Sequence, residues 1–115
     1  MWIFTKDGFL SVVQHNKLKD SFLVRARNEQ HLNNLFPWIK VVRVQRSDYP
    51  CRITVEKYTF MVEFCMKQVE KISYCNFKDS IEEVGYKEVC HQVWEEMAYY
   101  GNEVEEKGVN YPIAL

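Results

Sequence analysis

Four arginines occur in predicted β-strands at positions where their side chains would share one face of a sheet. They are Arg25, Arg27, Arg43 and Arg52. A guanidinium is planar and can pair through two N–H groups with a phosphate or a carboxylate. Four of them on one face predict a site for an anionic partner: a nucleotide, a strand of nucleic acid or an acidic protein surface. The alternative is an ordinary solvated sheet face, on which arginine stems cover apolar backbone.

Exposed aromatic rings beside this charge would provide stacking surfaces for bases. Tyr49, close to Arg52, and Trp2 and Phe4 in the first predicted strand are candidates. Tyr49 and Lys78 are expected at the rim of the arginine face. The isoelectric point of about 6.3 is low for a protein dedicated to duplex DNA, so a nucleotide or a single strand is the favoured ligand.

Catalytic and metal-binding chemistry has less support. His15 lies at the end of a predicted strand, beside Lys17 and Lys19, and could act as an acid or base on a phosphodiester, but no catalytic motif surrounds it. No Cys-x-x-Cys pair occurs among Cys51, Cys65, Cys75 and Cys90. A structural zinc site normally uses closely spaced ligand pairs, so we expect no metal site. We also expect no cofactor, and because no catalytic motif is present we assign no catalytic residue.

The formal charge of −1 hides two halves of opposite sign. Residues 1–55 contain nine basic and four acidic side chains, which gives +5, and residues 56–115 contain six and twelve, which gives −6. A length of 115 residues fits one domain, and 47% apolar residues exclude intrinsic disorder. No apolar run is long enough to span a bilayer, so we expect a cytoplasmic protein with no membrane contact.

The basic half is expected to form the sheet. Alternating apolar and polar residues predict strands over 2–5, 9–14, 21–27, 41–46 and 51–55. Asp7-Gly8 predicts a hairpin between the first two strands, and Asn28 is expected to cap a short helix that Pro37 ends. In the strand 41–46, Val42 and Val44 are expected to face the helices, with Arg43 on the opposite face.

The acidic half is expected to be helical. A helix over 56–72 carries two apolar stripes, one of which contains Phe60 and Phe64, so we expect cover on two sides, by the sheet and by the last helix or a second subunit. A short helix should end at Gly85, and a last helix over 86–100 should stop at Gly101. In this last helix the residues predicted to face inward are Val89, Val93, Met97 and Tyr100, with Trp94 beside them.

The predicted architecture is α+β: a four- to five-stranded, mostly antiparallel sheet with helices packed on one face. Residues 1–101 are expected to form a single domain, made of a sheet-rich basic part (1–55) and a helical acidic part (56–101). Residues 102–115 would then be a C-terminal tail or an arm that docks on a neighbour.

The motifs together resemble a family of short, uncharacterised proteins from bacteria and their phages. The matching segments lie in order within residues 1–100: 2–5, 8–13, 24–27, 48–55, 76–79 and 93–97. The resemblance implies no reaction or ligand, and it draws attention to the polar residues of those segments, Arg25, Arg27, Asp48, Tyr49, Arg52, Asn76, Lys78 and Asp79. Cys51 stands where that family usually has an aromatic residue.

The sequence therefore predicts a small non-enzymatic protein whose basic sheet face binds a nucleotide or a nucleic acid. The resemblance and the small size suggest a role in phage–bacterium defence or counter-defence. The alternative is a protein-interaction module or inhibitor, which could be a homodimer that pairs through the helix 56–72. An enzyme that acts on phosphodiesters is a third hypothesis.

Overall fold

The computed structural model describes residues 1–107 of the chain. The chain divides into two compact units, Met1–Phe77 and Lys78–Leu115. The first unit holds the β-sheet and the helical segments up to Glu70, and the second holds a 3₁₀ turn and the longest helix. The division falls inside the range 1–101 that the sequence predicts as one domain. No helix within residues 1–107 is both long enough and apolar enough to cross a lipid bilayer.

The first unit is built on a five-stranded sheet in which every neighbouring pair is antiparallel. Its order is β1-β2-β3-β5-β4. The strands are β1 (Trp2–Thr5), β2 (Gly8–Gln14), β3 (Ser21–Ala26), β4 (Val42–Arg43) and β5 (Cys51–Glu56). The α+β architecture predicted from the sequence is confirmed.

The β1–β2 hairpin is closed at Gly8, which pairs with Thr5. Gly8 has a φ of 158°, and a Cβ there would lie 2.6 Å from the Cβ of His31. His31 belongs to α1 (Glu29–Leu35), and its Nδ1 accepts a hydrogen bond from the Phe9 amide at 3.1 Å. Glycine is therefore required because α1 approaches the hairpin so closely.

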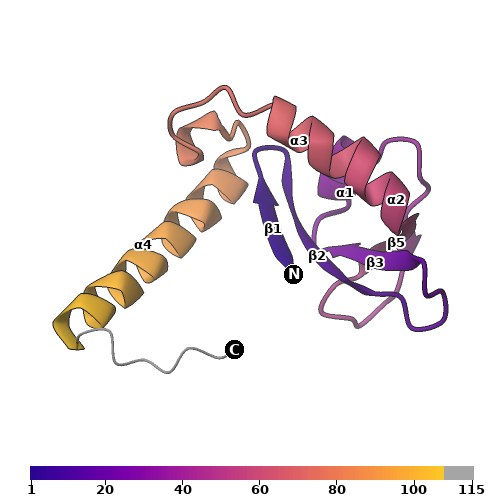
Figure 1. Ribbon diagram of the computed structural model, residues 1–115, viewed down its shortest axis with the longest axis horizontal. Helices are drawn as coiled ribbons and strands as arrows, with labels where there is room; N and C mark the ends of the chain where they lie inside the picture. Colours follow the sequence, from indigo (N-terminus) through magenta and orange to yellow (C-terminus); the bar gives the residue numbers. More distant parts are fainter. Residues whose placement is uncertain (108–115) are drawn as a thin grey trace. The chain divides into compact units, whose positions relative to one another are not determined.

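One face of the sheet forms the core with the helices. As predicted, Asn28 caps α1 and accepts a hydrogen bond from the Gln30 amide at 2.9 Å. Figure 1 shows α1, α2 and α3 gathered on one side of the strands. The buried cluster combines alternate strand residues with apolar helix and loop residues: Leu10, Val12, Val24, Ala26, Leu32, Leu35, Phe36, Cys51, Ile53, Val55, Phe60 and Phe64.

The second helical run of this unit spans residues 57–70. It consists of α2 (Lys57–Thr59), a π-helical stretch η1 (Phe60–Cys65) and α3 (Met66–Glu70). Phe60 and Phe64 face the core and stack near Phe36, with ring centroids 6.3 and 5.1 Å from that ring. Within the first unit the sheet covers only the inner side of this run, and Tyr58, Met61, Met66 and Val69 on its other side are exposed. The predicted cover of that side by the last helix or a second subunit stays a prediction.

The second unit contains a 3₁₀ turn, η2 (Lys78–Ser80), and the 24-residue helix α4 (Val84–Lys107). The predicted helix ends at Gly85 and Gly101 are wrong, because both glycines lie inside α4. A glycine within a helix costs only about 1 kcal/mol, which the rest of a long helix can offset. Of the residues predicted to face inward, Val89, Met97 and Tyr100 are exposed within the second unit, as is Trp94 beside them. Residues 102–107 of the predicted tail are helical, and the remainder of that tail lies outside the described residues.

Candidate anion-binding face

The second face of the sheet, opposite the core, is called here the open face. Strand pairing places one residue from each strand in a single row across it. Trp2 pairs with Ser11, Ser11 with Arg25, Arg25 with Arg52, and Arg52 with Val42. Side chains of directly paired residues point to the same side of a sheet. The predicted common face of Arg25 and Arg52 is therefore confirmed by the register.

Arg25 and Arg52 are direct cross-strand partners of like charge. Like charges placed opposite each other destabilise a sheet unless a counter-charge lies nearby. Within residues 1–107 no carboxylate lies within 4.0 Å of the guanidinium of Arg25, Arg27 or Arg52. The Nη2 of Arg25 donates to Ser11 Oγ at 2.8 Å, while its buried Nε has no acceptor among the described residues.

Tyr49 lies at the centre of this group, which we call the arginine cluster (Arg25, Arg27, Arg52 and Tyr49). Its ring is 4.6 Å from the guanidinium carbon of Arg25 and 4.9 Å from that of Arg27. Only 5% of Tyr49 is exposed, so the ring positions two arginines rather than offering a surface for a base. The predicted rim position of Tyr49 is wrong, because both of these guanidinium groups lie over its ring.

Arg52 forms hydrogen bonds that hold the β4–β5 loop against the open face. Its Nε donates to the Tyr49 carbonyl at 3.1 Å, and its Nη2 donates to Ser47 Oγ at 2.6 Å. Strand periodicity carries no signal for Ser47, because Ser47 lies in the turn before β5 and not in a strand. The same loop contains Arg46, whose φ of 60° is unusual for a residue other than glycine.

The arginine cluster retains free hydrogen-bonding capacity. A guanidinium has five N–H donors, and two of those on Arg52 bond the loop. Arg27 is exposed, and its guanidinium donates no hydrogen bond within residues 1–107. The cluster therefore presents positive charge and unused donors in a geometry that suits a phosphate or carboxylate group.

Aromatic side chains occupy the β1 end of the open face. Trp2 is 70% exposed and meets Phe9 edge to face, with ring centroids 6.2 Å apart. Phe4 lies 4.5 Å from Phe9 by the same measure. Trp2 and Arg25 are two strands apart in the row, which is about 10 Å. The open face thus combines one well-exposed stacking ring with the arginine cluster.

Arg43 lies on the other face of the sheet, so its predicted place beside Arg25 and Arg52 is wrong. It pairs with the buried Cys51, donates to that sulfur at 3.3 Å, and lies 3.8 Å from the carboxylate of Glu29 in α1. β4 has only two residues at the sheet edge. In so short a strand the predicted alternation can be offset by one residue. Such an offset moves every side chain of the strand to the other face of the sheet.

Lys78 belongs to the second unit rather than to the unit that carries the arginine cluster. Its ammonium lies 3.9 Å from the centroid of the Trp94 ring, on α4. The Lys78 ammonium therefore has a cation–π partner within the second unit.

His15 makes hydrogen bonds that support a turn, and Cys65 and Cys90 are partly or fully buried. The Nδ1 of His15 accepts hydrogen bonds from the amides of Lys17 and Leu18, at 3.1 and 3.0 Å, and so shapes the β2–β3 turn. Burial raises the pKa of the Cys65 thiol above its ordinary value of 9.0. Burial also raises the pKa of Cys90, against a smaller lowering by a hydrogen bond from Tyr86. Across residues 1–107, no group of three or more histidine, cysteine or acidic side chains is placed to hold a metal ion.

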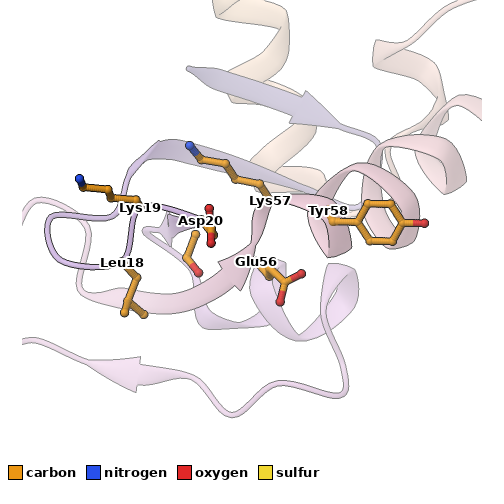
Figure 2. A pocket seen from close by; sticks show the side chains of 7 residues that line it. Leu18, Lys19, Asp20, Glu56, Lys57 and Tyr58 are labelled. Carbon is orange, nitrogen blue, oxygen red and sulfur yellow. The ribbon is translucent and has the colours of Figure 1, made fainter.

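A surface hollow of about 450 Å³ lies between the β2–β3 turn and the start of α2. Figure 2 shows the side chains that line it, which include Lys19, Asp20, Glu56 and Lys57. Two lysines and two carboxylates balance each other in charge. The hollow therefore attracts anions less than the arginine cluster does.

Comparisons of the chain with family models, curated proteins and solved structures found no match.

Proposed function

We propose that this protein is a small non-enzymatic binding protein that takes an anionic ligand on its open face. The observation that carries the proposal is the direct pairing of Arg25 with Arg52, beside Arg27, without a carboxylate partner among residues 1–107. A bound phosphate would relieve the repulsion between these like charges and use their free N–H donors.

The favoured ligand is a nucleotide or a single strand of nucleic acid. A base can stack on the exposed Trp2 ring while its phosphate lies toward Arg25 in the same row. An acidic protein surface would satisfy the guanidinium groups but would make no use of this ring. The presence of both groups on one face supports the nucleic-acid ligand.

We propose a bacterial or phage setting, in which the protein captures a nucleotide or blocks a defence complex. This part of the proposal is supported by the resemblance of segments such as 24–27 and 48–55 and by the small size of the chain. Both segments contribute arginines to the cluster. A defence role would therefore use the same surface.

Fluorescence anisotropy with a labelled oligothymidine strand tests the proposal. Arg27→Ala removes an exposed guanidinium that holds no loop, and we expect about tenfold weaker binding. Arg43→Ala is the matched control, because it removes the same charge from the opposite face and should leave binding within about twofold. Equal weakening by the two variants would reduce the effect to net charge and contradict a site on the open face. Binding of an acidic peptide in preference to the strand would favour a protein partner instead.

We propose self-association as a second candidate function. The observation that favours it is the outer side of the helical run 57–70, where Tyr58, Met61, Met66 and Val69 are each more than half exposed. Exposed apolar patches of this kind mark interaction surfaces in soluble proteins. This surface and the open face belong to opposite sides of the first unit, so the two functions can be tested separately.

A further inference from the structure

The open face is divided into an aromatic half and a basic half. β1 and β2 contribute the rings of Trp2, Phe4 and Phe9, which contact one another at centroid distances of 6.2 Å (Trp2–Phe9) and 4.5 Å (Phe4–Phe9). The arginine cluster occupies the other half, over β3 and β5. Ser11 lies between the two halves, because it pairs with Trp2 on one side and with Arg25 on the other.

Both halves repeat at the same interval. Trp2 and Phe4 are two residues apart on β1, so their side chains point to the same side of the sheet. Arg25 and Arg27 are also two residues apart, and their guanidinium carbons lie 4.6 and 4.9 Å from the centroid of one Tyr49 ring. Two residues of a β-strand span about 7 Å. The aromatic half and the basic half therefore each present two groups at this spacing.

The two repeats run in the same direction. β1 and β3 are each antiparallel to β2, so they are parallel to each other, and the step from Trp2 to Phe4 follows the step from Arg25 to Arg27. This arrangement gives two rows, each with one ring and one guanidinium. The first row is Trp2, Ser11 and Arg25, and the second row is Phe4, Phe9 and Arg27.

Each row is wide enough for one nucleotide. About 10 Å separates the backbones of Trp2 and Arg25, which are two strands apart. The Arg25 side chain reaches back toward the aromatic half, because its Nη2 donates to Ser11 Oγ at 2.8 Å. A base stacked on the ring can therefore have its phosphate at the guanidinium of the same row.

A single nucleotide would use only one row. It would leave one of the two guanidinium groups without a counter-charge, since neither Arg25 nor Arg27 has a carboxylate partner among residues 1–107. A single strand of nucleic acid laid along β3 would fill both rows with successive nucleotides. Bases of any sequence can stack on such rings.

Tyr49 holds the two guanidinium groups in place before a ligand arrives. Its ring is only 5% exposed, and its carbonyl accepts a hydrogen bond from Arg52 Nε at 3.1 Å. Because both arginines rest against this fixed ring, little side-chain freedom remains to be lost when two phosphates bind.

We infer that the ligand of the open face is a single strand of nucleic acid that runs along β3 and places two successive nucleotides in the two rows. Trp2 and Phe4 take the bases, and Arg25 and Arg27 take the phosphates. This inference rests on the proposed function and deepens it, because it selects a strand over a mononucleotide and gives the strand its direction and register.

A length series of ligands tests the two rows. Direct titration first measures binding of a labelled oligothymidine strand by fluorescence anisotropy, and unlabelled 5′-phosphorylated mono-, di- and trithymidylate then compete with it. The dinucleotide should bind at least about tenfold more tightly than the mononucleotide, because it adds a stacked base and a phosphate contact. The third nucleotide has no third row and should add less than about threefold.

The outcomes of this series separate the inference from the proposed function. A mononucleotide that competes as well as the dinucleotide would overturn the strand and leave the anion-binding face in place. A tenfold gain with every added nucleotide would overturn the limit of two rows. No binding of the labelled strand or of any competitor would overturn the proposed function itself.

Phe4→Leu tests the direction of the strand, because it keeps an apolar side chain against Phe9 but removes the stacking ring. We expect about tenfold weaker binding of the dinucleotide. Tyr58→Leu is the matched control, since it removes a ring that is 70% exposed on the helical run 57–70, and it should change binding by less than about twofold. If Trp2→Leu weakened binding and Phe4→Leu did not, the strand would cross β3 instead of following it, and the inferred direction would be wrong.

Salt dependence gives a second measurement that does not involve the aromatic variants. Arg27→Ala should reduce the slope of log affinity against log salt concentration by about 0.7, the value for one phosphate contact of a single strand. Arg43→Ala, on the opposite face, should leave the slope unchanged. An unchanged slope in Arg27→Ala would overturn the second phosphate contact, whether or not Phe4→Leu folds.

Discussion

Arg52 is expected to hold the β4–β5 loop in place, so Arg52→Ala should lower the free energy of unfolding. Arg52→Ala removes the hydrogen bonds to the Tyr49 carbonyl (3.1 Å) and to Ser47 Oγ (2.6 Å). Each bond is half-exposed and contributes about 1 kcal/mol, below the usual range for a charged donor. The variant also relieves the repulsion with Arg25, which is worth about 0.5 kcal/mol. The net loss is about 1.5 kcal/mol.

Thermal unfolding followed by circular dichroism measures this change. A loss of this size lowers Tm by roughly 6–12 °C for a unit of the size of Met1–Phe77. Arg27→Ala is the comparison, because it removes only a cation–π contact at 4.9 Å and should lower the free energy of unfolding by about 0.5 kcal/mol. If Arg52→Ala melted with the original chain, or if Arg27→Ala cost as much, the distinct roles assigned to the two arginines would be wrong.

Three further changes test the fold. Gly8→Ala should destabilise the protein by about 2 kcal/mol or more in urea unfolding, because its Cβ would lie 2.6 Å from His31 in a backbone conformation that L-residues rarely adopt; an unchanged midpoint would contradict the close approach of α1. Phe64→Ala should cost about 3–5 kcal/mol, because it empties a fully packed position beside Phe36; a cost below 1 kcal/mol would place the core elsewhere. Cys65 should react with iodoacetamide more slowly than the exposed Cys75, because the thiolate reacts and burial raises the pKa of Cys65; equal rates by mass spectrometry would argue against its burial.

Strand periodicity predicted the open face where strands are long and failed where they are short. β3 and β5 each have six residues, so alternation of core and polar positions places Arg25 and Arg52 on the same side without ambiguity. β4 has only two residues, too few to define which side chains alternate to which face, so the predicted face of Arg43 is wrong. Alternation of apolar and polar residues therefore predicts the face of a side chain in a strand of six residues, but not in a strand of two.

Loop positions and helix ends depend on contacts that a local pattern does not contain. Tyr49 follows a turn, and its burial under Arg25 and Arg27 arises from the way the loop folds over β3 and β5. Gly101 has the composition of a helix end, yet α4 continues to Lys107. The π-helical turn that aligns Met61 with Met66 likewise has no signature in hydrophobic spacing. Each of these features depends on tertiary contacts or backbone geometry that the local sequence does not encode.

Chemical-shift mapping by NMR tests the central claim most directly, because it locates the ligand on the sheet. Addition of an unlabelled oligothymidine strand to the ¹⁵N-labelled protein should shift the Trp2 indole signal and the amides of residues 24–27 and 51–54. The amides of α1, beside Arg43 on the opposite face, should stay in place. Shifts confined to α1 and Arg43, or spread evenly over every basic residue, would contradict an anion-binding site on the open face.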